Sequence, residues 1–481
     1  MKALIPNPYV DYCESRPVTA QKKLYIVTFG CQMNEYDSQQ MAQILQDEYV
    51  LTDDPKQADL ILINTCSIRE KAENKVYSLV GRFKSLKVNR PEVIIGVAGC
   101  VAQQMGQTLL KKAPHLDIVF GPQGIAHLPQ LIEQVKKGKG PACYTELKKN
   151  YSIPLISAPA PNPTPVRAFV TIMQGCDNFC TYCVVPFVRG REISRPYEDI
   201  LAEVKSMIRQ GAKEITLLGQ NVNSYGKKNS DLPDFATLLR LVSQIEGLER
   251  LRFTTSHPKD LSRTIMECYR DLSNLCEHLH LPVQSGSNNI LKRMNRHYTR
   301  EHYLGLVDQL RSICPEITLT TDLIVGFPGE THEDFKQTID LLEKVQFDQI
   351  FAFKYSPRPF TKAALFKDQV PEEEKSKRLT EVLELQREIG YRRYKALEGK
   401  TVEVLVEGQG KSSAQQLIAR TRGNHVVNLA GPKDLIGKIL SVTIDKACYH
   451  SLKAAVKTQE SNFDNRRSHG SNSHVCACNN P

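Results

Sequence analysis

The sequence predicts an α/β protein with two successive regions of parallel sheet and a small all-β region near the C-terminal end. Short apolar runs rich in Ile and Val have the composition and length of parallel strands that are buried on both faces. Helical patterns alternate with these runs, as in βαβ units with right-handed crossovers. Strand-like runs separated by Gly-rich turns follow later in the chain. The 481 residues accommodate about two to four domains.

The first sheet region is predicted over residues 22–140, after a loose, proline-broken arm at residues 1–21. Its strands are expected at LYIVTFG (24–30), ADLILINT (58–65) and EVIIGVAG (92–99). Between the last two strands, residues 69–87 carry apolar side chains at helical spacing, with charged residues on the opposite face. The region is therefore expected to be a βαβαβ unit.

A Pro-rich linker at residues 141–161 leads to the second sheet region, residues 162–395. Six strands are expected there, at AFVTIMQG (168–175), EITLLGQN (214–221), RLRFTTS (250–256), HLHLPVQ (278–284), ITLTTDLIVGF (317–327) and FDQIFAFKYS (347–356). Helical patterns lie between them. Six βα repeats predict a barrel or partial barrel, whose chemistry lies at the C-terminal ends of the strands.

The third region, residues 396–459, is predicted to be a small β-barrel with strands at TVEVLVEG, NHVVNLA and KILSVTI. Residues 401–447 contain six Lys or Arg and four acidic residues, a net charge of +2. The tail at 460–481 is rich in Asn, Ser and His, and we expect it to be disordered. The tail contains residue types that can bind metals, so it either binds a metal ion or is a solvated end without structure; these residues are His469, His474, Cys476 and Cys478.

Composition and the terminal segments exclude two classes of protein. No run approaches the ~18 consecutive apolar residues of a membrane span, and the N-terminus lacks the apolar stretch of a secretory signal. We therefore expect a cytoplasmic location. Because disulfides are rare in the cytoplasm, the 14 cysteines indicate metal binding or catalysis rather than disulfides. The net charge of +10 is compatible with a polyanionic partner.

The strongest local signal is the segment GCDNFCTYC, which places Cys176, Cys180 and Cys183 just after the first strand of the predicted barrel. Three thiolates at this spacing can close on one metal centre. A structural zinc ion normally takes a fourth ligand, whereas three ligands on a four-iron cubane leave one iron open. Three buried or redox-active cysteines are the alternative.

A second set of cysteines is separated by 35 and 34 residues: Cys31, Cys66 and Cys100. Each cysteine follows one predicted strand of the first sheet region. Because parallel strands bring their C-terminal ends to one edge of a sheet, the three thiols should converge. The alternative is coincidence, since Cys is common near buried strand ends.

The spacing of the first set, with an aromatic residue before its last cysteine, resembles the signature of radical S-adenosylmethionine (SAM) proteins. Residues 22–455 also contain FGCQMNEYDS, NTCSIREKAENKV, AGCVAQQ, TTSHP, LPVQSGSN and DLIVGFPGE. With these motifs the chain resembles the methylthiotransferases, and among them the bacterial tRNA branch. The resemblance implies a flavodoxin-like N-terminal domain, a radical SAM (βα)6 partial barrel and a C-terminal TRAM domain that binds RNA.

The resemblance also implies cofactors and their ligands. Cys176, Cys180 and Cys183 would hold a 4Fe-4S cluster whose open iron chelates SAM, and Cys31, Cys66 and Cys100 would hold an auxiliary 4Fe-4S cluster. Motifs at later strand ends imply SAM contacts, and these residues are Gly219, Gln220, Asn221, Gln284 and Gly326.

The implied reaction is methylthiolation of carbon 2 of N6-isopentenyladenosine at position 37 of tRNA, with SAM as methyl donor and radical source. The implied partners are an isopentenylated anticodon loop and a low-potential electron donor such as flavodoxin or ferredoxin, with the enzyme a monomer. The sulfur source stays open. Alternatives are a methylthiotransferase for threonylcarbamoyl-adenosine tRNA or a ribosomal-protein aspartate, or an iron–sulfur protein that binds RNA or transfers electrons.

Three arginines after the cysteine loop, Arg189, Arg191 and Arg195, could bind RNA phosphate or the SAM carboxylate, or could be solvated surface residues. His257 and His280 near strand ends have either a structural or an acid/base role. We interpret the remaining cysteines as structural or incidental: Cys13, Cys143, Cys268, Cys276, Cys314 and Cys448.

The chain departs from the family pattern near the end of the barrel region. The family usually has YSPRPGTPAA, whereas residues 355–364 read YSPRPFTKAA. Phe360 and Lys362 thus replace Gly and Pro, and can alter a loop near the substrate.

Overall fold

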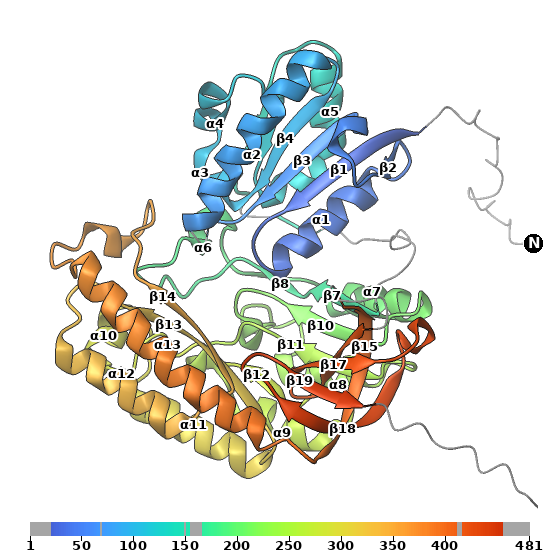
Figure 1. Cartoon of the computed structure of the whole chain (residues 1–481). Helices are drawn as coiled ribbons and strands as arrows, with labels where there is room; N and C mark the ends of the chain where they lie inside the picture. Colours follow the sequence, from blue (N-terminus) through green and yellow to red (C-terminus); the bar gives the residue numbers. More distant parts are fainter. Residues whose placement is uncertain (1–20, 68–69, 149–150, 154–165, 411–415, 456–481) are drawn as a thin grey trace, which may run out of the picture.

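The computed structural model describes residues 21–67, 70–148, 151–153, 166–410 and 416–455. Cys13, residues 154–161 of the predicted linker and the Cys/His tail lie outside these residues, and so does nearly all of the predicted arm. Figure 1 shows the N-terminal sheet stacked above the central part, with the small C-terminal barrel beside the central strands. Among the described helices, none is both long and apolar enough to cross a membrane.

The N-terminal part is a six-stranded parallel sheet in the order β2-β1-β3-β4-β5-β6. Its strands are β1 (Lys22–Thr28), β2 (Tyr49–Leu51), β3 (Leu60–Thr65), β4 (Ile94–Gly99), β5 (Ile118–Phe120) and β6 (Ala142–Tyr144). Its helices are α1 (Gln32–Ile44), α2 (Glu70–Asn89), α3 (Cys100–Met105), α4 (Gln107–Lys112) and α5 (Leu128–Lys136). Every residue of β3 and β4 is buried, as expected of central parallel strands.

The sheet is wider than the sequence predicts. The three predicted strands are present as β1, β3 and β4, but β2, β5 and β6 add three more, each of three residues. β6 pairs with β5 and lies inside the predicted linker at 141–161, so the sheet extends to Tyr144. The linker boundary was wrong because a three-residue strand is too short to show a period along the chain.

The central part contains all six predicted strands in two parallel sheets, β7-β10-β11 and β12-β13-β14. They are β7 (Arg167–Thr171), β10 (Glu214–Leu218), β11 (Arg250–Phe253), β12 (His278–His280), β13 (Thr318–Val325) and β14 (Gln349–Lys354). A single bridge between Leu251 and Leu275 joins the two sheets, and the result is a partial barrel. A short antiparallel pair, β8 (Met173–Gln174) and β9 (Ile193–Ser194), lies at its upper edge.

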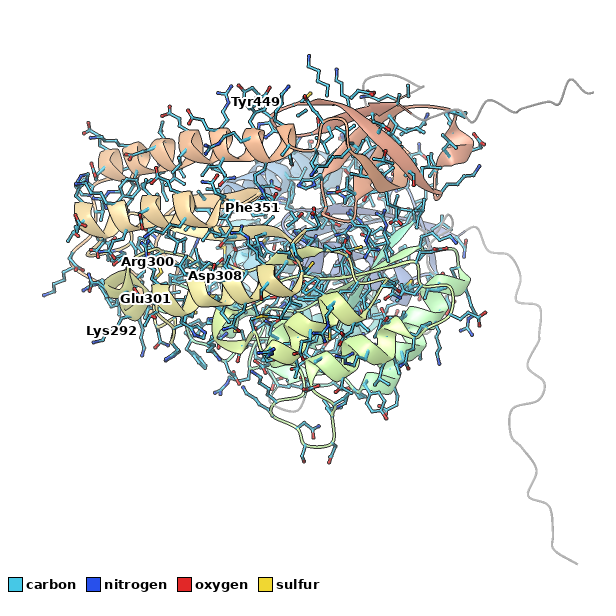
Figure 2. The ribbon with its side chains drawn as sticks, turned by 90° about the horizontal axis from the view of Figure 1, so that it is seen from below. Lys292, Arg300, Glu301, Asp308, Phe351 and Tyr449 are labelled. Atoms are coloured by element: carbon cyan, nitrogen blue, oxygen red, sulfur yellow. The ribbon has the colours of Figure 1, made fainter. Side chains whose placement is uncertain are left out.

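Helices cover the outside of the central strands and close one large apolar core. They are α7 (Tyr197–Arg209), α8 (Phe235–Ser243), α9 (Arg263–Asp271), α11 (Arg300–Ile313), α12 (His332–Val345) and α13 (Glu372–Lys395). The short helix α10 (Asn288–Arg293) contributes to a small separate apolar cluster, and α6 (Val185–Val188) packs against Cys100 of the N-terminal part. α13 leads into the C-terminal barrel. Figure 2 shows Tyr449 where the two meet, and there its ring lies 4.8 Å from that of Tyr391.

The C-terminal barrel is closed by five strands in the order β15-β16-β17-β19-β18. They are β15 (Thr401–Gln409), β16 (Gln416–Thr421), β17 (Val426–Ala430), β18 (Ile439–Ala447) and β19 (Leu452–Ala455). The sequence predicted β15, β17 and β18, and missed the two strands that complete the closure.

The C-terminal barrel docks on the N-terminal ends of the central strands. Arg250 at the start of β11 donates to Glu403 at 2.8 Å, and Arg252 donates to the carbonyl of Thr421 at 2.8 Å. Arg422 donates to Glu277, just before β12, at 2.7 Å. The small barrel therefore sits at the opposite end of the strands from the cysteine loop.

Candidate functional site

The second cysteine set lies at one edge of the N-terminal sheet. Cys31 follows β1, Cys66 follows β3 and Cys100 begins α3 after β4, and these three strands are neighbours in parallel register. Gly30 has a φ of +127°, and a side chain there would overlap Cys66, so the loop before Cys31 lies directly against Cys66. The geometry places the three residues at adjacent strand ends.

A buried ion pair from the central part closes over this edge. Arg189 donates to Asp37 at 2.7 Å and to Asn34 at 3.1 Å, and the Arg189 and Asp37 side chains are only 3% and 6% exposed. Hydrogen bonding with Cys66 lowers the pKa of Cys31 to about 6, aided by the charge of Arg189, while burial raises the pKa of Cys100. The Nη1 atom of Arg189 is buried and has no hydrogen-bond partner among the described residues.

Of the two alternatives for these three arginines, phosphate or SAM binding and a solvated surface, the solvated surface is excluded for Arg189 and Arg195, which are both buried. Arg195 is fully buried and donates to Glu203 at 2.7 Å; the Tyr36 hydroxyl from the N-terminal part donates to the same carboxylate at 3.2 Å. Arg189 and Arg195 therefore fasten the two parts together, and burial keeps them from RNA phosphates. Only Arg191 is exposed, and it pairs with Asp177.

The first cysteine set lies in the loop after β8, held from two sides. Gln220 accepts a hydrogen bond from the amide of Gly175 at 2.5 Å, and Arg296 donates to the sulfur of Cys180 at 3.5 Å. Burial raises the pKa of Cys176 to about 11 and that of Cys183 to about 12. These thiols become thiolates only when a strong positive charge binds to them, as a metal centre provides.

Neither cysteine set forms a site for a single ion. Within the described ranges, no three His, Cys, Asp or Glu side chains come close enough to hold one metal ion. A four-iron cubane spaces its ligands more widely than a single ion does. Three thiols are the number of protein ligands that leave one iron of a four-iron cubane open.

The predicted SAM contacts gather at the C-terminal ends of the central strands. Gly219, Gln220 and Asn221 follow β10, Gln284 lies beyond β12 and Gly326 follows β13. The two glycines have packing reasons of their own: a side chain at Gly219 would overlap Met173, and one at Gly326 would overlap Lys375. Close packing is thus a sufficient reason for glycine at these two positions. Among the predicted SAM contacts, Gln220 accepts the hydrogen bond that holds the cysteine loop.

Buried polar atoms without partners mark the same strand ends, and sequence reasoning missed two of their residues, Asn223 and Ser256. The amide atoms of Asn223, the hydroxyl of Ser256, Oδ1 of Asn221 and Nε2 of His257 have no hydrogen-bond partner within the described part of the chain. Buried polar groups of this kind indicate a bound ligand or water. Ser256 lies within the TTSHP motif, which could have pointed to it, whereas no motif signals Asn223, because a single Asn after a strand is common.

The two histidines near strand ends differ in environment. Burial lowers the pKa of His257 far below its usual value, so this imidazole is neutral and unsuited to act as a general acid. Its Nδ1 accepts from the amide of Lys259 at 3.3 Å. His280 contacts the Thr320 hydroxyl at 2.9 Å and lies 3.5 Å from Asp322. Of the other cysteines, Cys268, Cys276 and Cys314 are buried, which fits a structural role.

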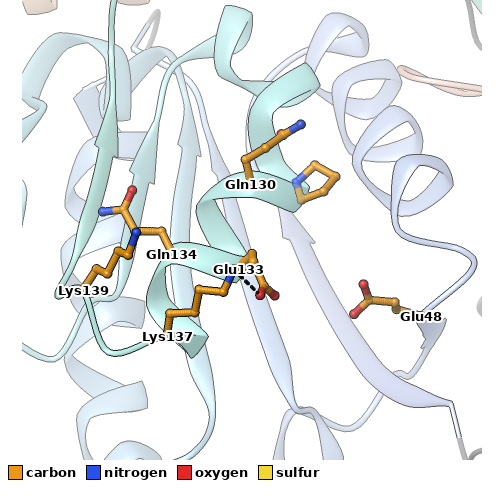
Figure 3. A pocket seen from close by; sticks show the side chains of 7 residues that line it. Glu48, Gln130, Glu133, Gln134, Lys137 and Lys139 are labelled. Atoms are coloured by element: carbon orange, nitrogen blue, oxygen red, sulfur yellow. Dashed lines mark ion pairs between the residues drawn. The ribbon is translucent and has the colours of Figure 1, made fainter.

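A shallow depression of about 450 Å³ lies on the N-terminal part, away from both cysteine sets. Figure 3 shows its lining, in which Lys137 pairs with Glu133 at 3.1 Å and Glu48 stands opposite. Its open, charged lining contains none of the predicted site residues.

Three family models match the chain. The uncharacterized protein family UPF0004 matches residues 23–121, the radical SAM superfamily residues 170–342 and the TRAM domain residues 395–457. A solved radical SAM methyltransferase, TsrM from Kitasatospora setae, shares the fold with a TM-score of 0.55 at 14% identity, over 72% of this chain and 75% of that one. The fold and site thus define a radical SAM protein with an additional N-terminal domain and a TRAM barrel.

Curated relatives resemble the chain over nearly its whole length. The tRNA-2-methylthio-N(6)-dimethylallyladenosine synthase of Syntrophus aciditrophicus is 49% identical, over 92% of this chain and 95% of the relative. That of Carboxydothermus hydrogenoformans is 50% identical, over 88% of this chain and 97% of the relative. The chain belongs to the family of tRNA-2-methylthio-N(6)-dimethylallyladenosine synthases.

Proposed function

We propose that this enzyme converts N6-isopentenyladenosine at position 37 of tRNA to its 2-methylthio derivative. The observation that carries the proposal is the placement of two three-cysteine sets at strand ends on either side of one interface, which Arg189 bridges. Family membership supports the reaction. The hydrogen bond from Arg189, six residues after Cys183, to Asn34 beside Cys31 supports placing the two proposed metal centres on either side of the domain junction.

Radical chemistry suits this substrate. Carbon 2 of the adenine offers neither an acidic proton nor a leaving group, so acid/base and nucleophilic catalysis have no point of attack. The neutral state of His257 agrees with this. When bound, two 4Fe-4S clusters and SAM would supply a carbon radical, a methyl group and an open iron that can carry the sulfur to be transferred.

The residues of the chain hold these groups and exclude water. Cys176, Cys180 and Cys183 would ligate the cluster that binds SAM, and Cys31, Cys66 and Cys100 the auxiliary cluster. Gln220 orients the first cysteine loop, and Arg296 donates to Cys180. We favour as SAM contacts Asn221, Gln284 and the unpartnered polar atoms near His257. Gly219 and Gly326 would also contact SAM, although both glycines are packed closely against side chains of the protein.

The partners follow from the family and the C-terminal barrel. tRNA is the substrate, and we propose that its anticodon loop enters at the cysteine end of the central strands. Bases of single-stranded loops can be splayed out of the stack, as this chemistry requires. A low-potential flavodoxin or ferredoxin would reduce the clusters in the cytoplasm, and the enzyme would act as a monomer.

The decisive experiment compares two anticodon stem-loops that differ only in the isopentenyl group. Anaerobically reconstituted enzyme should methylthiolate the isopentenylated stem-loop and leave plain adenine unmodified, as read by nucleoside mass spectrometry. Five buried carbons at ~0.8 kcal/mol each provide ample discrimination. Equal turnover of both stem-loops, modification of threonylcarbamoyl-adenosine tRNA, or methylthiolation of a ribosomal protein would contradict the proposal. An RNA-binding protein without SAM cleavage would place the chain in another class.

A further inference from the structure

Two exposed aromatic rings lie together beside the first cysteine loop. Phe187 belongs to α6, which begins two residues after Cys183, and is 41% exposed. Phe360 is 64% exposed, and the two ring centroids are 6.0 Å apart. Single exposed apolar residues are ordinary on a protein surface, but apolar side chains that gather on it mark binding sites.

Phe360 occupies a backbone position that favours glycine. The amide of Thr361 donates to the carbonyl of Arg358 at 3.3 Å and closes a tight turn with Pro359 second and Phe360 third. The φ of Phe360 is +69°. A type II turn often has proline at its second position and has a residue with positive φ at its third position, where Gly is usual. Phe360 therefore strains the backbone while its ring stays mostly in solvent, so folding stability gives no reason for it.

The turn is fixed against the cysteine loop. The amide of Ala363 donates to the carbonyl of Thr181, between Cys180 and Cys183, at 2.9 Å. Thr361 and Ala363 are buried on either side of the exposed Lys362. The Phe360 ring is thus held at a set place at the edge of the radical site.

Positive charge accompanies the aromatic rings. Lys362 and Lys367 are exposed in the same segment as Phe360. Arg191 also lies over the ring of Phe179 in the cysteine loop, 5.0 Å from its centroid, but it is paired with Asp177, so Lys362 and Lys367 are the better candidates for phosphate contact. Aromatic rings among cationic side chains are the composition with which proteins bind single-stranded nucleic acid, through base stacking and phosphate attraction.

We infer that Phe187 and Phe360 form a stacking platform for an unpaired base of the tRNA anticodon loop, adjacent to the adenine that reacts. This inference rests on the proposed function and adds a contact to it. The C-terminal barrel docks at the far end of the central strands, away from the cysteine loop. The platform supplies a contact for the RNA beside the cysteines.

The first test separates binding from folding. Reconstituted F360G should bind the isopentenylated stem-loop about 5- to 100-fold more weakly, the range expected for the loss of one stacked base. Its melting temperature should stay the same or rise, because glycine relieves the positive φ. F360Y, which keeps an aromatic ring, should bind like the wild type. L365A removes an 83% exposed side chain from the same segment and serves as the matched control.

The second test uses the absence of tryptophan from the sequence. F360W carries a single indole at the platform, and its fluorescence should be quenched when the stem-loop binds. L51W carries a single indole on β2, where Leu51 is 55% exposed at the outer edge of the N-terminal sheet, and its fluorescence should not change.

Three outcomes would be decisive against the inference. Wild-type affinity in F360G, or unquenched F360W with bound stem-loop, rules out stacking. Unchanged tRNA affinity with slower cluster reduction by flavodoxin would assign the rings to protein docking and overturn the platform. If the wild-type enzyme itself neither binds nor modifies the stem-loop, the proposed function fails first, so the two failures are distinguishable.

Discussion

At the residue scale, the buried ion pair between Arg189 and Asp37 gives a prediction about stability. R189Q leaves a buried carboxylate without its cation, which costs roughly 3–5 kcal/mol. Burial already raises the pKa of Asp37, and loss of the arginine raises it further. A raised folded pKa favours the folded state at low pH, and that advantage fades as pH rises toward the folded value. Urea unfolding should therefore show a larger deficit for R189Q at pH 8 than at pH 5, and D37N should recover part of it at pH 8. A deficit that does not depend on pH would assign the loss to packing.

At the scale of the element, β18 and β19 place two lysines opposite one another. Lys446 and Lys453 are paired across the strands and exposed, although like charges there oppose each other. Arg420 and Arg422 are already committed to Glu407 and Glu277, so these lysines are better candidates for phosphate contact. The double variant K446A/K453A should weaken tRNA binding. The slope of log affinity against log salt concentration should become shallower by about one to two, and the melting temperature should not fall. K433A, also exposed on this barrel, is the control, and an unchanged slope in the double variant would move the RNA contact elsewhere.

At the scale of the whole molecule, the two cysteine sets lie in parts that each have a large apolar core of their own, joined by buried ion pairs and by two small apolar clusters. Loss of one metal centre should therefore leave the other intact. Reconstituted enzyme should hold about eight irons if both centres are four-iron cubanes. Replacing Cys31, Cys66 and Cys100 with Ala should halve the iron, abolish methylthiolation and preserve SAM cleavage, measured as 5′-deoxyadenosine. Full iron in this triple variant would show that the strand-end cysteines are not ligands.

The sequence by itself determined the order of the three parts, every long central strand and the cysteines at the strand ends. These features are local, because long apolar runs and motif spacing are properties of contiguous residues. The tertiary structure decided what depends on partners far along the chain. The three-residue strands β2, β5 and β6 exist only as additions to a neighbouring sheet. The sequence left Arg189 and Arg195 open between a binding role and a solvated surface. Only the fold shows them buried against Asp37 and Tyr36, more than 150 residues earlier in the chain. The strained turn at Phe360 became visible only with its positive φ, because composition alone does not reveal a backbone angle.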